Sequence, residues 1–288
     1  MNTEFTVLGG DERLLYMAED LIEQGFNVHL LGFDKHKKAC DISFNSDLSD
    51  ALKKSRAVIL PVPVSRDGVN LNAPLSNETV SLKLIADSLT PGCLVFCGMA
   101  GEFAEMLFKK GIRVYDYALR DEFAVRNAVP TAEGVCEILI HSLPITLRSS
   151  RIFITGYGRT AKACAKLFGS MGSRVTVAAR RCSSLASASS EGYEALYIRE
   201  LHRHIHRADV LINTVPAPII DKKIIDGARS DCLFVEIASA PYGIDADYAQ
   251  KRGIRTINAP SLPGRTSPKT AGIIIGDTVL NILREGNE

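Results

Sequence analysis

The chain has 288 residues, of which 46% are hydrophobic and 23% are charged, and its formal net charge is +1. This length suits two domains of ordinary size, and the near-neutral charge gives no general attraction to nucleic acid or to a membrane surface. No apolar run approaches the roughly 18 residues of a membrane-spanning helix, and the N-terminus leads into a predicted strand without a basic signal region. We therefore expect a cytoplasmic globular protein whose partners are small molecules or other proteins.

Seven cysteines are scattered along the chain: Cys40, Cys93, Cys97, Cys136, Cys164, Cys182 and Cys232. Their odd number and mostly apolar surroundings indicate reduced core thiols rather than a disulfide framework. Among the alternating histidines at 202, 204 and 206, only His202 and His206 would share a face of the exposed helix expected there. Because no carboxylate is placed to complete a ligand set, we predict no metal site.

The N-terminal half alternates strands and helices. A strand at 5–8 passes through Gly9-Gly10-Asp11 into an amphipathic helix, and a second strand follows at 27–32. Further strands are predicted at 57–60, 93–97 and 113–117. The glycine turn is not a G-x-G-x-x-G sequence, and Asp11 would repel a phosphate. The turn is therefore either structural or a substrate-facing loop with Arg13 close by.

The stretch from Val64 to Glu78 has the composition of a loop. A polar loop at the carboxyl end of a parallel strand is where open α/β sheets place ligand contacts, although it can equally be a surface loop without a role. A helix is then predicted from an N-cap at Thr131 to about Leu143, and it forms the natural hinge between domains. Glu133 near its start is either a catalytic acid or base, or an acid favoured by the helix dipole.

The segment Thr155-Gly156-Tyr157-Gly158-Arg159-Thr160-Ala161 joins an apolar strand at 151–155 to a helix with apolar residues at i, i+3, i+4 and i+7. Gly156 would allow the turn, and Gly158 would let a pyrophosphate approach bare backbone. Ala161 takes the third place of the G-x-G-x-x-G/A fingerprint. The amides at the helix start would then hold the phosphates. A tight turn without a ligand is the alternative.

A second strand at 174–178 ends in Ala179-Arg180-Arg181-Cys182-Ser183. NAD-binding units usually carry an acidic residue there for the ribose 2′-hydroxyl, whereas arginine suits the 2′-phosphate of NADP. Two guanidinium groups stand in place of the acid, and Ser183 offers a further donor. We therefore favour NADP(H), with a solvated basic turn as the alternative.

Three more strands are predicted at 209–213, 234–239 and 256–259, and a terminal helix follows. The turn Thr214-Val215-Pro216 would line the nicotinamide ribose. Ser267 is expected to cap the terminal helix, with Pro268 in its first position. Lys269 in the first turn opposes the helix dipole, which makes sense if an anion binds there; an exposed lysine without a role is the alternative.

The predicted fold is α/β, with two doubly wound parallel-sheet domains. A flavodoxin-like substrate domain covers residues 1–126 and is completed by 268–288, where the terminal helix returns to it. A Rossmann domain covers 127–267. This arrangement resembles the D-2-hydroxyacid dehydrogenases, but the arginine and histidine that those enzymes need are replaced by Ala238-Ser239-Ala240 and by residues 260–264. Their chemistry is therefore not expected here.

A closer resemblance runs along nearly the whole chain, to the dipicolinate synthase A-subunit family of spore-forming bacteria. It is carried by Gly9-Gly10-Asp11 with Arg13, Gly32-Phe33-Asp34, Ser76-Asn77-Glu78-Thr79, Pro130-Thr131-Ala132-Glu133-Gly134, Gly156-x-Gly158-Arg159, Ile212-Asn213-Thr214-Val215-Pro216, Pro263-Gly264 and Pro268-Lys269-Thr270-Ala271-Gly272. Two departures stand out. Ala161 replaces the third fingerprint glycine, and Ala240 replaces a lysine of the family's loop.

The resemblance implies oxidation of dihydrodipicolinate to dipicolinate with NADP⁺ during sporulation, in the mother-cell cytoplasm. It also implies the flavoprotein-like B subunit of dipicolinate synthase as partner, and we expect a homo-oligomer. The expected cofactor-binding residues are Gly156, Tyr157, Gly158, Arg159, Thr160, Ala179, Arg180, Arg181, Ser183, Thr214, Val215, Pro216, Ala238 and Ser239. A dicarboxylate substrate needs cations and helix-start amides across the interdomain cleft, and the expected residues are Arg13, Arg120, Thr131, Ser267, Lys269 and Thr270. Asp121 and Glu133 are the candidate bases, and Lys269 is a further catalytic candidate.

Two other functions remain open. One is an NADP-dependent dehydrogenase of another small carboxylic acid. The other is a non-catalytic NADP-binding regulatory subunit, which the absence of a convincing acid/base pair in the sequence favours.

Overall fold

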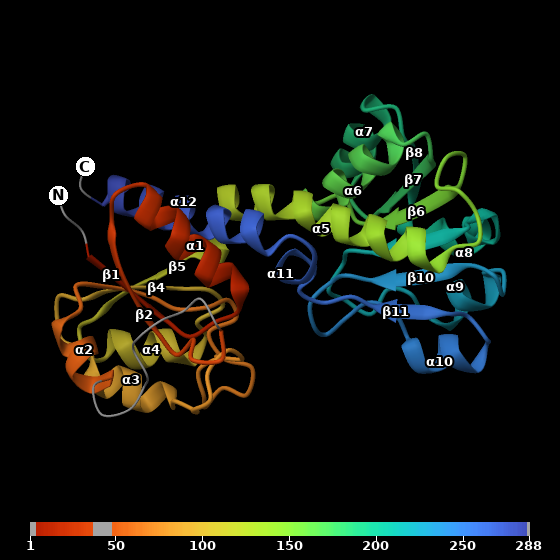
Figure 1. Ribbon diagram of the computed structural model, residues 1–288. Coiled ribbons are helices and arrows are strands. Elements are labelled where there is room, and N and C mark those ends of the chain that lie inside the picture. The colour runs from red at the N-terminus through yellow and green to blue at the C-terminus, as the bar shows by residue number, and fades with distance from the viewer. Residues whose placement is uncertain (1–3, 37–47, 287–288) are drawn as a thin grey trace. The chain divides into compact units, whose positions relative to one another are not determined.

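The structure is a computed structural model that describes residues 4–36 and 48–286. The chain forms two compact units (Figure 1), of which unit 1 comprises Met1–Arg126 with Ser267–Glu288 and unit 2 comprises Asn127–Thr266. Ser267, which the sequence analysis assigned to the second domain, therefore falls in unit 1 with the terminal helix. Cys40, expected in the core, lies outside the described residues.

Unit 1 is built on one parallel sheet with the strand order β2-β1-β3-β4-β5. Its strands are β1 (Glu4–Leu8), β2 (Asn27–Leu31), β3 (Ala57–Ile59), β4 (Leu94–Cys97) and β5 (Arg113–Asp116). Its helices are α1 (Glu12–Glu23), α2 (Leu48–Lys54), α3 (Leu82–Ser88), α4 (Glu102–Phe108), the 3-10 turn η1 (Tyr117–Leu119), the start of α5 (Asp121–Ser142), and α12 (Pro268–Glu285). The strand order reverses between β1 and β3, and ligands of such sheets bind at the carboxyl ends of the strands at that switch point.

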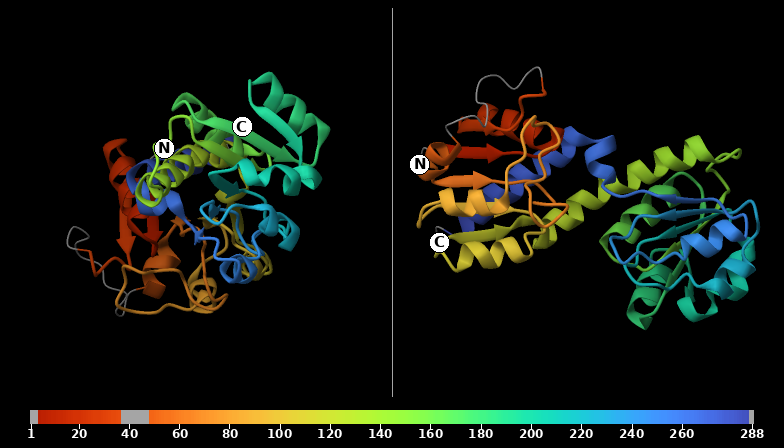
Figure 2. Two further views of the ribbon diagram at one scale, coloured as in Figure 1. Left: turned by 90° about the vertical axis from the view of Figure 1, so that its right-hand side faces the viewer. Right: turned by 90° about the horizontal axis from the view of Figure 1, so that it is seen from below.

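Helices cover both faces of this sheet (Figure 2). Side chains of α1 and α12, such as Leu14 and Ile275, pack with Phe5 and Val7 on one face. Side chains of α2, α3 and α4 pack on the other face in a separate cluster with Val58 and Val95. The sheet is therefore buried on both sides, which explains why its strands read as short apolar runs.

The packing of α1 against α12 depends on two glycines. A Cβ added at Gly272 would lie 2.2 Å from the carbonyl oxygen of Arg13, and one added at Gly276 would lie 3.2 Å from Cγ of Met17. Gly272 and Gly276 are four residues apart, and so are their neighbours Arg13 and Met17, in the same order along the chain. The two helices therefore run parallel, and α12 begins beside the start of α1. The predicted return of the C-terminal helix to the first domain is confirmed.

Unit 2 is a six-stranded parallel sheet with the order β11-β10-β9-β6-β7-β8, the Rossmann arrangement. Its strands are β6 (Arg151–Thr155), β7 (Arg174–Ala179), β8 (Glu194–Tyr197), β9 (Val210–Asn213), β10 (Leu233–Glu236) and β11 (Thr256–Asn258). Its helices are the rest of α5, α6 (Arg159–Ser170), α7 (Cys182–Ser190), α8 (Leu201–His204), α9 (Lys222–Gly227), α10 (Ala246–Lys251) and α11 (Leu262–Thr266), with the 3-10 turns η2 (Ile198–Glu200) and η3 (Ile205–Arg207). Strand β8 was not predicted; it is an edge strand and only Leu196 of its four residues is buried.

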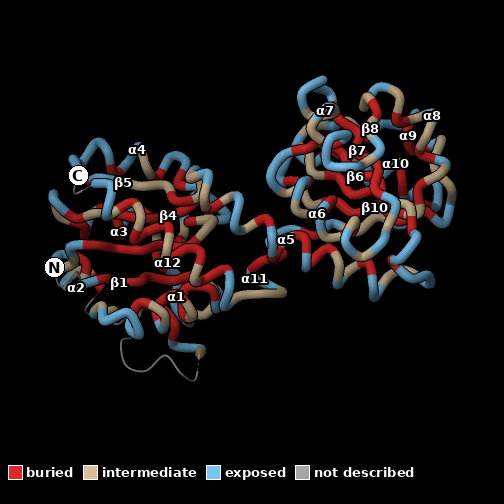
Figure 3. Tube along the Cα trace, turned by 90° about the horizontal axis from the view of Figure 1, so that it is seen from above, coloured by how far each residue is buried: buried red, intermediate tan, exposed pale blue. Residues whose placement is uncertain are grey.

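Buried residues follow the strands of both units (Figure 3). In unit 2, α5, α6 and α7 pack on one face of the sheet, and α8, α9 and α10 pack on the other. The predicted apolar face of α6 is confirmed, since Ala161, Cys164, Ala165 and Phe168 are all fully buried. The α/β fold with two parallel-sheet domains is thus as expected.

Helix α5 corrects one expectation. It begins at Asp121 and continues through Pro130 to Ser142, so Thr131 lies in its interior and is not an N-cap. The Thr131 hydroxyl instead donates to the carbonyl oxygen of Asn127, 2.7 Å away. Glu133 likewise lies in mid-helix, so the explanation of this residue as a first-turn acid is wrong.

The cysteines differ in their burial. Cys93, Cys97, Cys164 and Cys232 are buried, whereas Cys136 is half-buried and Cys182 is exposed. Residues 201–204 form the short helix α8, and no group of three or more potential metal ligands occurs within the described residues. Over that same part of the chain, no helix is both long and apolar enough to cross a membrane.

Candidate functional site

The glycine turn of unit 2 lies between β6 and α6, at the carboxyl edge of the sheet. Gly156 has a φ of +82°, and its amide donates to the carbonyl oxygen of Ala178 at 2.8 Å. A Cβ at this position would lie 2.9 Å from both Oγ1 of Thr214 and Cγ2 of Val215. Glycine is therefore required here by the fold itself, both for its backbone conformation and for the close approach of the β9 loop.

Gly158 differs from Gly156. Its φ of −81° is open to any residue, and an added Cβ would meet no protein atom within 4 Å. The protein's own packing therefore does not require glycine at position 158. Gly158 is the N-cap of α6, and no side chain caps this helix, so its first amides are open to an anionic ligand. Arg159 and Thr160 form the first turn of the same helix.

The side chain of Tyr157 points away from this turn. It is 7% exposed, its hydroxyl donates to Oε2 of Glu191 at 2.8 Å, and Nζ of Lys162 lies 5.2 Å from its ring centroid. Of the cofactor contacts expected for Tyr157, only those of its backbone remain available.

The strand beside the glycine turn, β7, ends at the buried Ala179 and delivers Arg180 and Arg181 to the surface. Arg181 is the N-cap of α7 and makes no side-chain capping bond, and Ser183 is in the first turn of this helix. Within residues 4–36 and 48–286, no carboxylate is within ion-pair distance of either guanidinium group. Two exposed cations thus lie where the ribose 2′ position of a dinucleotide would be.

The turn after β9 meets the glycine turn directly. Oγ1 of Thr214 donates to the carbonyl oxygen of Thr155 at 2.6 Å, which places Thr214 and Val215 against Gly156. Pro216, at the end of this turn, is exposed. Strands β6 and β9 flank the switch point of the sheet, so three of the sequence motifs converge at one edge.

A buried polar network supports these loops, and the sequence analysis assigned it no role. Oε1 and Oε2 of Glu236, at the end of β10, accept from the Asn213 side-chain amide at 2.7 and 3.0 Å. They also accept from the amides of Ala238, Gly243 and Ile244. Asn213 in turn accepts from the Thr155 hydroxyl. An acid at the end of an apolar strand, followed by a loop, is the signal that could have identified this network.

The expected cofactor residues Ala238 and Ser239 follow Glu236 in that loop. Ala238 is 7% exposed and is held by its amide, while Ser239 is exposed. A Cβ added at Gly243 would lie 2.3 Å from Nδ2 of Asn213, so this loop packs directly on the β9 turn. The two loops consequently hold each other in place.

Arg13, one of the cations expected to bind substrate, is already paired within unit 1. Arg13 is 8% exposed, and its guanidinium donates to both oxygens of Asp11, at 2.8 and 2.9 Å, and to the carbonyl oxygen of Val62. Burial opposes its charge, but the hydrogen bond and the charge of Asp11 raise the pKa of Arg13. This ion pair neutralises both groups, so Asp11 repels no anion and Arg13 attracts little.

Arg120 is also paired, and it lies elsewhere. It donates to Glu122 at 2.8 Å and to both oxygens of Glu285 at 2.8 and 2.6 Å. Glu285 is the last residue of α12, whereas Lys269 is in its first turn. A helix of 18 residues separates its ends by roughly 27 Å, so Arg120 does not share a site with Lys269.

The start of α12 retains the groups expected there. Ser267 occupies the N-cap position but forms no side-chain cap, so its predicted capping bond is absent, and Pro268 takes the first position as expected. Lys269 and Thr270 are exposed. Among the described residues, Lys269 has no ion-pair partner. Uncapped helix-start amides and one cation therefore lie beside the start of α1.

The two candidate bases lie on α5, Asp121 at its first residue and Glu133 in its middle, and both are exposed.

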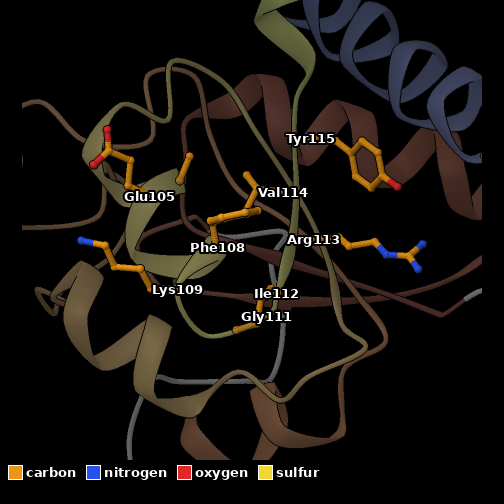
Figure 4. A pocket seen from close by; sticks show the side chains of 9 residues that line it. Glu105, Phe108, Lys109, Gly111, Ile112, Arg113, Val114 and Tyr115 are labelled. Atoms are coloured by element: carbon orange, nitrogen blue, oxygen red, sulfur yellow. The ribbon is translucent and has the colours of Figure 1, made fainter.

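A large cavity of unit 1 lies away from all these groups. It has a volume of about 750 Å³ and is lined by residues of α4 and β5, including Glu105, Phe108, Arg113 and Tyr115 (Figure 4). Figure 4 shows Phe108 and Val114 on one side of β5 and Tyr115 on the other. This cavity is beside an edge strand and not at the switch point, so it is not the candidate site.

Two family profiles match the chain, one in each half. Residues 4–118 match the N-terminal domain of the dipicolinate synthase A subunit, and residues 139–263 match shikimate / quinate 5-dehydrogenase. The second match and the Rossmann sheet together indicate a dehydrogenase-type domain for a nicotinamide dinucleotide.

The relatives that match over almost their whole length are also dipicolinate synthase A subunits. The chain is 32% identical to the dipicolinate synthase A subunit of Bacillus subtilis over 98% of this chain and 96% of that protein. Crystal structures of this synthase subunit from Bacillus halodurans and Bacillus subtilis superpose with TM-scores of 0.89 and 0.88, at 28% and 29% identity. They cover 98% and 99% of this chain, and 98% and 97% of their own chains, respectively. The chain therefore belongs to the dipicolinate synthase A-subunit family.

Proposed function

We propose that this protein oxidises dihydrodipicolinate to dipicolinate with NADP⁺, as the dinucleotide-binding component of a two-component synthase. The observation that carries the cofactor assignment is the contrast between Gly156 and Gly158. The fold requires the first glycine, whereas nothing in the protein's packing requires the second. A pyrophosphate that lies against the backbone of residue 158 would explain why this residue is glycine.

The choice of NADP⁺ rests on Arg180 and Arg181, which have no carboxylate partner among the described residues and follow the strand next to the glycine turn. A guanidinium group binds a phosphate through parallel charge-assisted hydrogen bonds. An acidic residue for a ribose 2′-hydroxyl is absent from residues 179–183.

When bound, the oxidised nicotinamide accepts a hydride, so the dihydropyridine ring must lose that hydride and one proton to become aromatic. The chain's contribution is then to bind and to orient. The uncapped starts of α6 and α7 would hold phosphates, and Thr214 and Val215 would border the nicotinamide ribose. Lys269, Thr270 and Ser267 at the start of α12 would hold a substrate carboxylate, and Asp121 or Glu133 would receive the proton.

The test follows the absorbance of reduced cofactor with freshly generated dihydrodipicolinate. The protein is assayed alone and with the flavoprotein-like B subunit, using NADP⁺ and NAD⁺ in parallel. We expect turnover with a preference for NADP⁺. Tight NADPH binding without turnover in either assay would favour a non-catalytic NADP-binding protein. Turnover of other small carboxylic acids in place of dihydrodipicolinate would favour a different dehydrogenase. The same preparations examined by light scattering would test the expected homo-oligomer.

A further inference from the structure

We infer that Arg66 of unit 1 binds one carboxylate of the substrate, and that Asn72 is the positioning residue that holds it. This inference rests on the proposed function, because it names a partner for the second anionic group of a dicarboxylate. It starts from the finding that Arg13 and Arg120 are already occupied by carboxylates of the chain.

Arg66 lies in the loop that follows β3, at the switch point of the unit 1 sheet. The amide of Val64, two residues earlier, donates to the carbonyl oxygen of Gly98, and the amide of Asn72 donates to that of Val64. The Gly10 amide then donates to the carbonyl oxygen of Asn72 at 3.0 Å. The loop is thereby fastened to the glycine turn between β1 and α1.

The side chain of Asn72 connects this framework to Arg66. Asn72 is 7% exposed, and its Nδ2 donates to the carbonyl oxygen of Pro63 at 3.1 Å, which fixes the orientation of its amide. Its Oδ1 then accepts from Nε of Arg66 at 3.1 Å. A buried amide with both ends bonded thus restrains an exposed guanidinium.

This contact uses only Nε of Arg66. Within the described residues, no hydrogen bond or ion pair engages its two terminal nitrogens. Terminal guanidinium nitrogens in a fixed plane can donate two parallel hydrogen bonds to a carboxylate. An arginine restrained in this way loses less conformational entropy on binding than a mobile one would.

The adjacent Asp67 forms no ion pair with Arg66, because its oxygens are engaged within the loop. Its carboxylate accepts from the Ser65 hydroxyl, from the amides of Val69 and Asn70, and from the Asn70 side chain. These bonds, those from the Asn70 and Val69 amides first, lower the pKa of Asp67. Asp67 therefore shapes the loop, and no carboxylate of the described residues forms an ion pair with Arg66.

The start of α12 supplies a second subsite in the same unit. Since α12 runs parallel to α1, with Gly272 against Arg13, Lys269 and Thr270 lie at the same carboxyl edge of the sheet as the β1 and β3 loops. The inference assigns one carboxylate of the proposed substrate to each of these two cations.

The experiment measures calorimetric binding of dipicolinate (pyridine-2,6-dicarboxylate) and of pyridine-2-carboxylate to the full chain with saturating NADP⁺. The variants are R66Q, R66K and the control R56Q, which removes an exposed cation beside the amino end of β3. We expect R66Q to weaken dipicolinate binding by roughly 10- to 100-fold, the range for one charge-assisted contact. We expect R66K to recover part of the loss, and R56Q to match the wild type.

Three further readouts separate binding from folding. The melting temperature and the NADPH affinity of R66Q should be unchanged, and the preference for the dicarboxylate over the monocarboxylate should shrink. In turnover, KM for dihydrodipicolinate should rise while kcat changes little, as for a contact made equally in the ground and transition states.

If the wild type binds dipicolinate and R66Q binds it equally well, the inference is overturned and the proposed function stands. The inference is also overturned if R56Q loses as much affinity as R66Q, because the effect would then be one of general charge. If the wild type binds no dicarboxylate at all, the inference and the proposed function fail together.

Discussion

The Asn213 side-chain amide donates to both carboxylate oxygens of Glu236, at 2.7 and 3.0 Å, and so joins the ends of two neighbouring strands of unit 2. The same carboxylate accepts hydrogen bonds from the backbone amides of Ala238, Gly243 and Ile244. Glu236 is only 3% exposed. A buried carboxylate with this many donors keeps the loops after β9 and β10 in one arrangement. Those loops border the switch point where the cofactor is proposed to bind.

We expect E236Q to destabilise unit 2 and to weaken cofactor binding. Glutamine replaces one acceptor oxygen with an NH₂ group that faces the amide donors, and each buried donor left without an acceptor costs about 1–3 kcal/mol. Urea unfolding followed by circular dichroism, together with NADPH titration by fluorescence, measures both effects. The exposed Glu137 provides the control E137Q, which should stay within about 0.5 kcal/mol of the wild type. Equal stability of E236Q and E137Q would contradict the role assigned to Glu236.

The two glycines of the turn should respond differently to alanine. G156A forces a side chain into a left-handed conformation and against Thr214, which should cost about 1–3 kcal/mol of stability. G158A should change the stability of the fold little, because its backbone conformation suits alanine and the entropy gain in the unfolded chain is offset by the poor N-cap preference of alanine.

NADPH binding distinguishes ligand contact from folding in this pair. For G158A we expect an affinity loss of roughly tenfold or more, since displaced phosphate oxygens lose charge-assisted hydrogen bonds to the α6 amides. Thermal melts and NADPH titrations of the same preparations check this. A stable G158A protein with wild-type affinity would show that no pyrophosphate approaches this backbone.

Arg180 and Arg181 should determine the choice between the two dinucleotides. Replacing both by glutamine should reduce NADPH affinity by roughly 10- to 100-fold and leave NADH affinity nearly unchanged, since only the 2′-phosphate is lost as a partner. The matched control is R203Q on α8, another exposed arginine of unit 2. Parallel titrations of each protein with NADPH and NADH measure the two affinities. An equal loss for both cofactors, or a similar loss in R203Q, would rule out 2′-phosphate recognition.

The contact between α1 and α12 predicts a graded response to added methyl groups. G272A places a Cβ against the backbone of Arg13, which cannot move aside without shifting a helix, and overpacking of this kind costs about 1–3 kcal/mol. For G276A the one tight contact is with Cγ of Met17 at 3.2 Å, in a flexible side chain, so its cost should be smaller. Differential scanning calorimetry of the two variants measures the order. The reverse order would mean that the helices pack in another register.

Asp209 should give unit 2 a defined acid sensitivity. Burial opposes its ionisation, but hydrogen bonds from the side chain and backbone of Arg151 and the charge of Arg229 lower its pKa. A carboxyl whose pKa is lower in the folded state stabilises fully above its unfolded pKa of about 3.9, and this stabilisation disappears as the pH falls through the folded value.

D209N should therefore lose about 1–3 kcal/mol at neutral pH, the range for hydrogen bonds to charged groups, and this deficit should shrink as the pH falls below the unfolded pKa of about 3.9. Urea unfolding of both proteins between about pH 2 and pH 8 gives the difference directly. The control D231N removes a carboxylate that also pairs with Arg229 but whose side chain is 69% exposed, so a small effect is expected. A D209N deficit that does not shrink in acid would show that the charge of Asp209 contributes nothing.

Local patterns of the sequence determined much of this protein. Apolar runs, glycine turns and helical periodicity predicted ten of the strands, the Rossmann turn and the terminal helix, because these features depend on neighbouring residues. The edge strand β8 escaped prediction because little of it is buried. The extension of α5 through Pro130 escaped because helix propensity alone would end it there.

Only the tertiary structure decided which charged groups remain available to a ligand. Arg13, Arg120 and Arg66 look equivalent in the sequence, yet the first two are neutralised by Asp11 and Glu285 and the third is held by the amide of Asn72. In the same way, Glu236 became the centre of a network only when the ends of three strands came together. Pairing of charges depends on distances between residues far apart in the chain, and those distances are set by packing.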